Sequence, residues 1–211
     1  MDAALLDIVA GIPPVTKIWA IGCVGLSILT STNAIDPTKK WYTFELAFKK
    51  GQYDRIIYSL FDHGEFNWMS IFNIFVSVNH LASLENSFAI KRRFCWMVTI
   101  ALGIILLMSS IAQPVSSLGI VLYENLVYYQ IRKTGNEMNI MLFGGVNVSP
   151  LILPLYMNCT MLFVHHKTML QVAMNFLPGH ALYYLDDIFM KLYDVDLCKT
   201  PYDFWLDYRR R

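Results

Sequence analysis

The sequence predicts an all-α, polytopic membrane protein with six transmembrane helices in a single domain over residues 1–211. Two observations support this fold class. First, 55% of the residues are hydrophobic and only 16% are charged, with a mean hydropathy of +0.42. Soluble domains carry about 25% charged residues, so part of this apolar surface needs lipid as its solvent. Second, six segments approach the ~20 apolar residues that a helix needs to cross a bilayer.

The predicted spans differ in quality. The third is the most uniformly apolar, Glu124 interrupts the fourth, and the sixth fades after Leu185 into two aspartates. Helices the length of the fourth and fifth rise only about 25 Å, against a hydrocarbon core of roughly 30 Å. Short spans of this kind favour local thinning of the bilayer. In chain order, the predicted spans are Val15–Ile35, Phe66–Leu84, Phe94–Ala112, Val115–Ile131, Val148–Val164 and Thr168–Leu185.

The segments outside the spans indicate how the chain is oriented. Residues 36–64 mix aromatic and basic side chains, a composition that favours the headgroup region, so we expect an interfacial first loop. Basic residues gather in the connections at 91–93 and 132–133 and in a short tail at 191–211. Because basic residues concentrate on the cytosolic side of membrane proteins, this bias predicts that both termini are cytosolic.

Polar side chains inside the spans suggest a hydrated interior. An ionised carboxylate at mid-bilayer costs about 3 kcal/mol, so we expect Glu124 to face other helices or water. A lateral groove lined by polar side chains is the favoured interpretation, and hydrogen bonds that only pack the helices together are the alternative. The candidates are Arg55 at the rim of the groove and, within the spans, Asn73, Asn79, His80, Glu124, Asn125, Asn175 and His180.

Several short motifs occur in an order that resembles the derlin family of ER-resident, rhomboid-like pseudoproteases, in its short-tailed branch. The resemblance covers nearly the whole chain. One departure is Asp54, which stands where the family usually has the Trp of a Trp-Arg pair, whereas Arg55 is retained. The landmarks are Pro14-Val15-Thr16, Gly51-Gln52-Tyr53-Asp54-Arg55, Asn73, Leu84-Glu85, Met138-Asn139, Phe143-Gly144, Gly179-His180, Asp187 and Lys199-Thr200-Pro201.

The resemblance implies a rhomboid-like fold in the endoplasmic reticulum membrane and a non-catalytic role in ER-associated degradation. The implied activity is retrotranslocation of misfolded lumenal proteins, together with a multi-span RING ubiquitin ligase and its adaptor subunits. The tail lacks the motif with which longer derlins recruit the cytosolic AAA segregase, so coupling to that motor is expected to be indirect.

An active rhomboid protease is the alternative function. Such enzymes carry G-x-S-G at the start of span four and a histidine in span six. Here Ser117 and His180 are present, but Val115 and Leu118 replace the two glycines, and Met69 replaces a histidine in span two. Because those glycines let backbone amides and helices approach closely, the substitutions argue against catalysis.

Other classes of function find less support. The four cysteines are widely spaced without a CxxC pair, so we expect neither a disulfide framework nor a metal site. No nucleotide-binding motif is present, so no cofactor is expected. A net charge of +1 gives no basic stripe for nucleic acid. A small-solute transporter is a further alternative, but the sequence lacks matching halves with paired broken helices.

Overall fold

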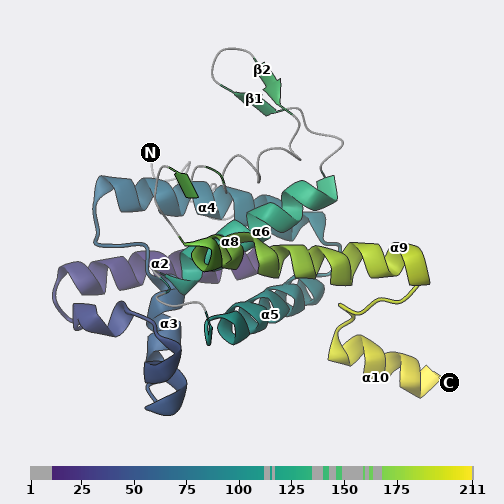
Figure 1. The fold of residues 1–211 in the computed structure, drawn as a ribbon, viewed down its shortest axis with the longest axis horizontal. Coiled ribbons are helices and arrows are strands. Elements are labelled where there is room, and N and C mark those ends of the chain that lie inside the picture. Colours follow the sequence, from purple (N-terminus) through teal and green to yellow (C-terminus); the bar gives the residue numbers. More distant parts are fainter. Residues whose placement is uncertain are drawn as a thin grey trace. The chain divides into compact units, whose positions relative to one another are not determined.

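The computed structural model describes residues 11–111, 115, 117–134 and 168–210, with short pieces at 140–142, 146–148, 159 and 162–163 (Figure 1). These residues fall into two compact units, one from residues 1–95 and 113–123 and the other from residues 96–112 and 124–211. Helices dominate both. The elements are α2 (Pro14–Ser31), η1 (Pro37–Lys40), η2 (Glu45–Lys49), α3 (Asp54–Phe61), α4 (Trp68–Ser87), α5 (Lys91–Met108), α6 (Leu118–Thr134), β1 (Ile140–Leu142), β2 (Val146–Val148), α8 (Met169–Tyr183), η3 (Tyr184–Ile188), α9 (Phe189–Tyr193) and α10 (Pro201–Arg210).

Five of the six predicted spans coincide with helices, namely α2, α4, α5, α6 and α8. Among the helices that the structure describes, only α2 is both long enough and apolar enough to cross a membrane by these two criteria alone. Most of the predicted fifth span lies outside the described residues. The segment before it forms an antiparallel hairpin, in which Ile140 pairs with Val148, and the sequence reading did not include these strands.

In the first unit, α2 packs along α4. Cys23, Ile74 and Val78 form a buried apolar cluster between the two helices, and Trp19 and Phe61 pack against it. Gly22 faces the Phe61 ring so closely that a Cβ atom there would overlap it. The glycine therefore lets α3, which ends at Phe61, lie against α2.

The start of α2 depends on a residue from another helix. Its N-cap is Pro13, which makes no capping hydrogen bond, so the first amides of α2 need an outside acceptor. The fully buried Glu85, near the end of α4, supplies it. Its carboxylate accepts from the backbone N–H groups of Val15 (3.3 Å) and Thr16 (2.8 Å) and from the Thr16 hydroxyl (2.8 Å). A negative charge at this end also complements the helix dipole.

In the second unit, the backbone stays helical from Met169 through Tyr193 in three consecutive elements, α8, η3 and α9. We predicted that this span ends at Leu185, because Asp186 and Asp187 follow, but the helix continues past that point. Asp186 is buried rather than at a water-facing end, and its carboxylate is paired with Lys133 (2.7 Å). The helix ends at Asp194, which adopts a left-handed conformation with φ of 55°.

The predicted first loop and tail both contain regular structure. Residues 36–64 hold η1, η2 and α3. Arg55 on α3 holds this segment together, since its guanidinium donates to the carbonyl oxygens of Thr38 (2.5 Å) and Trp41 (3.1 Å). The tail folds into α10, a helix that the sequence reading did not anticipate.

Candidate functional site

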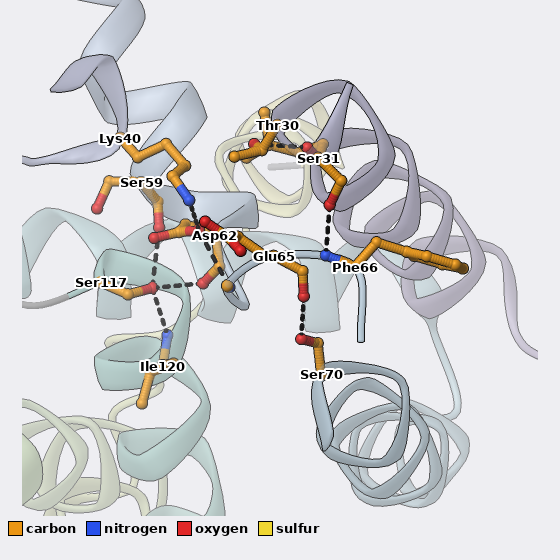
Figure 2. A network of polar contacts seen from close by, with 12 residues as sticks. Thr30, Ser31, Lys40, Ser59, Asp62, Glu65, Phe66, Ser70, Ser117 and Ile120 are labelled. Carbon is orange, nitrogen blue, oxygen red and sulfur yellow. Dashed lines mark hydrogen bonds and ion pairs between the residues drawn. The ribbon is translucent and has the colours of Figure 1, made fainter. Parts of the chain in front are cut away.

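The first polar centre lies where α6 begins, next to the end of α3 (Figure 2). Ser117 is 2% exposed. Its hydroxyl lies 2.9 Å from the Asp62 carbonyl oxygen and 3.1 Å from the Ser59 carbonyl oxygen. It also accepts from the Ile120 amide at 3.3 Å, as an N-cap does. In return, the Ser59 hydroxyl accepts from the Leu118 amide at 3.0 Å. Ser117 therefore ties the first loop to the start of α6.

The same contact is reinforced by backbone packing and by an ion pair. A Cβ atom at Gly119 would overlap the Leu60 carbonyl oxygen, so only glycine allows the two backbones to meet here. Val115 pairs with Tyr42 in an isolated antiparallel bridge. Lys40 lies 3.3 Å from Asp62, with both side chains largely buried. The segment that corresponds to the protease motif thus serves as an anchor for the loop.

Ser117 and His180 are the two residues that the disfavoured protease alternative would use as a catalytic pair. The Ser117 hydroxyl has one proton, and both acceptors within its reach are loop carbonyls. The Nδ1 atom of His180 lies 2.9 Å from the Tyr128 hydroxyl. A serine nucleophile donates its proton to a base, whereas both acceptors that the structure gives the Ser117 hydroxyl are backbone carbonyls.

The second polar centre compensates for a proline inside α8. Pro178 has no N–H, so the carbonyl of Met174, four residues earlier, lacks its helical donor. Asn125 on α6 replaces that donor, with its Nδ2 atom 2.8 Å from the Met174 oxygen. Its Oδ1 atom accepts from the Gly179 amide at 2.7 Å, so one buried side chain bridges both sides of the break.

Gly179 makes this bridge possible. A Cβ atom at this position would overlap the carbonyl oxygen of Asn125, so the α8 backbone can approach α6 this closely only at a glycine. Asn125 was expected to line a groove. Its amide makes one hydrogen bond to each of two backbone groups, as the alternative of hydrogen bonds that pack the helices would have it.

Further polar contacts continue along α6. Tyr128 contacts His180 and also accepts from Arg132 at 3.0 Å. At the next residue of each pair along α6, the Tyr129 hydroxyl (2.5 Å) and Lys133 (2.7 Å) donate to the Asp186 carboxylate. The Asp186 side chain is buried, whereas that of Lys133 is 39% exposed, and the Tyr129 hydrogen bond helps to satisfy the buried carboxylate. The sequence reading missed both Tyr129 and Lys133 as partners, because their spacing to Asp186 depends on tertiary packing.

The remaining candidates fall into two groups. On α4, Asn73, Asn79 and His80 are exposed, and the His80 ring lies 6.1 Å from that of Tyr123. Glu124 on α6 and Asn175 on α8 are half-buried, and each has polar or electrostatic partners. Among the described residues, no cluster of three or more His, Cys, Asp or Glu side chains could hold a metal ion.

Comparison with known proteins identifies the family. The chain is 55% identical over 205 residues to "Degradation in the endoplasmic reticulum protein 1" of Saccharomyces cerevisiae, covering 97% of both chains. It is also 25% identical over 198 residues to the "Probable derlin-2 homolog" of Dictyostelium discoideum, covering 90% of this chain and 77% of that protein. The model of the Der1-like family matches residues 12–202. The chain therefore belongs to the Der1-like family, a family of membrane proteins.

Proposed function

We propose that this chain is a non-catalytic component of ER-associated degradation that helps to move misfolded lumenal proteins toward the cytosol. The observation that carries the proposal is the 55% identity, over 97% of both chains, to a yeast protein named for degradation in the endoplasmic reticulum. Its partners would be a multi-span RING ubiquitin ligase with its adaptor subunits and, indirectly, the cytosolic AAA segregase.

The contacts of Ser117 support the non-catalytic part of the proposal. A residue whose hydroxyl caps α6 and holds two loop carbonyls is used for structure. Its release as a nucleophile would leave buried backbone groups without partners, at about 1–3 kcal/mol for each group. Nothing in the comparisons favours the protease alternative.

The topology in this proposal has six spans, a rhomboid-like fold and both termini in the cytosol. Helix α6 has 17 residues and α2 has 18, so they rise about 25 and 27 Å, less than a typical hydrocarbon core. Short helices of this kind support local thinning of the membrane. A glycosylation tag at the C-terminus should stay unmodified, and a glycosylated tag would refute the proposed orientation.

The substrate path in this proposal follows α4. Asn73 and His80 are exposed and seven residues apart, which puts them on one side of that helix, whereas Phe75 is exposed on the other side. Asn79 is four residues after Phe75 and so lies on that second side of α4. Asn79, Arg55, Glu124, Asn175 and His180 remain further candidates. We assign Asn125 to helix packing, since its amide bonds to the backbone of α8 on both sides of the proline break.

Site-specific photocrosslinking tests this path. A photoreactive residue would replace Asn73 or His80 in the full-length chain, with Phe75 as the matched control on the same helix. A stalled, glycosylated, misfolded lumenal protein should crosslink at positions 73 and 80 and much less at position 75. Equal crosslinking at all three positions, or none at positions 73 and 80, would refute the path along α4.

A further inference from the structure

Helix α10 has several local interactions that stabilise its helical form. Its N-cap, Thr200, accepts from the Asp203 amide at 3.2 Å, and the Thr200 hydroxyl donates back to the Asp203 carboxylate at 2.6 Å. Pro201 occupies the first helical position, which proline favours. Lys199 forms an ion pair with Asp207. Isolated helices of this length are only marginally stable in water. The cap and the ion pair therefore contribute to keeping this segment helical.

The helix presents aromatic side chains to its surroundings. Tyr202, Trp205 and Tyr208 recur at three-residue intervals along one side, and the Tyr202 and Trp205 rings lie 6.0 Å apart. Trp205 is 51% exposed and Tyr208 is 83% exposed. The two aspartates lie four residues apart on the opposite side, so the helix is amphipathic with an uncovered aromatic side.

We propose that α10 lies in the plane of the membrane surface, with its aromatic side in the headgroup region of a bilayer that contains anionic lipids. Tyrosine and tryptophan favour this region because their rings are apolar and their polar tips can stay in water. The connection from α9 is only residues 194–200. Seven residues reach at most ~25 Å, so α10 stays close to the end of the predicted sixth span.

The charges of the helix fit an anionic surface. Asp203 is engaged by its own N-cap and Asp207 by Lys199, so both carboxylates have local partners. Arg209 packs over the Trp205 ring at 5.4 Å, on the aromatic side of the helix. Two further arginines follow in the sequence. Basic residues near an anionic leaflet are attracted to it, which favours lipid over an uncharged protein groove.

An environment-sensitive fluorophore at two adjacent positions tests the inference. Full-length protein, with its four cysteines replaced, would carry the label on Tyr208→Cys, on the aromatic side, or on Asp207→Cys, on the acidic side. Loss of the exposed Asp207 ion pair costs little, so α10 should persist in the control. The protein would be placed in nanodiscs of phosphatidylcholine alone or with about one-third phosphatidylserine, the second composition being chosen for charge.

The label at position 208 should be quenched by nitroxide-labelled lipid several-fold more strongly than the label at position 207. That difference should grow with phosphatidylserine and shrink at 1 M salt, where the Debye length is about 3 Å. Arg209→Gln should reduce the effect of phosphatidylserine while leaving quenching in phosphatidylcholine unchanged. Equal quenching at the two positions, or a label at position 208 that is reached only by a water-soluble quencher, would overturn the proposal. The result is independent of any role in degradation, because it requires only that the chain is in a bilayer.

Discussion

Replacement of Asn125 by leucine should destabilise the protein by leaving the proline break in α8 unbridged. Leucine has nearly the same size, so the substitution removes the amide with little change in packing volume. The Met174 carbonyl would lose its 2.8 Å donor, and the Gly179 amide would lose its 2.7 Å acceptor. The effect therefore comes from two backbone groups at one site.

The magnitude follows from the two orphaned groups. A buried backbone group without a partner costs about 1–3 kcal/mol, which gives about 2–6 kcal/mol for the pair. Hydrogen bonds between membrane helices average only about 0.6 kcal/mol and reach about 1.7, because the unfolded state in lipid also finds partners. For two bonds the lower bound is about 1 kcal/mol. We expect a loss of about 2 kcal/mol in the free energy of unfolding.

The assay is reversible unfolding of the purified protein in bicelles. The pair of changes Asn125→Leu and Pro178→Ala forms a double-mutant cycle, because alanine at position 178 restores the amide that Met174 lacks. The double variant should recover about half of the loss. Gln130→Leu, a half-buried position on the same helix, serves as the matched control and should change stability little. Stability of Asn125→Leu within 0.5 kcal/mol of the parent, or no recovery in the double variant, would refute the bridge.

Two further predictions concern the first unit. Glu85→Gln should lower the free energy of unfolding by about 1–2 kcal/mol, because it removes the charge that caps α2, whereas Glu65→Gln at an exposed position should not. Burial lowers the pKa of His63 from its ordinary value near 6.5, so the unfolded chain binds a proton more readily than the folded one. Stability should therefore fall as the pH drops below about 6.5. His63→Phe should weaken that dependence in pH-resolved unfolding, and an unchanged pH profile would contradict the assignment.

Apolar run length and composition located the long helices well, because a long apolar run has few alternatives to a helix in lipid, but they did not reveal the short helices of the first loop or α10. The predicted first four spans start and end within a few residues of α2, α4, α5 and α6. The end of the sixth span was missed for a specific reason. Two adjacent aspartates normally mark a helix end in water. Asp186, however, pairs with Lys133 and accepts a hydrogen bond from Tyr129, both more than fifty residues earlier in the chain.

The candidate polar residues were identified correctly as unusual, but their roles depend on tertiary packing. Pro178 within an apolar helix shows from sequence alone that Met174 needs a new donor. Nothing in the local pattern says that Asn125 supplies it. Similarly, the lack of a capping side chain at Pro13 shows that α2 needs an outside acceptor, but only the packing of α4 against α2 identifies Glu85.

The half-life of a misfolded lumenal reporter tests the central claim, a non-catalytic role in ER-associated degradation, most directly. Yeast cells that lack the related protein would be complemented with the parent chain or with Ser117→Ala, and degradation would be normalised to the abundance of each variant. Loss of the Ser117 hydroxyl should lower abundance, because the Ser59 and Asp62 carbonyls and the Ile120 amide each lose a hydrogen-bond partner. The account predicts that the parent restores degradation and that Ser117→Ala matches it per molecule. A Ser117→Ala protein of normal abundance that leaves the reporter as long-lived as in cells without the protein would contradict the account.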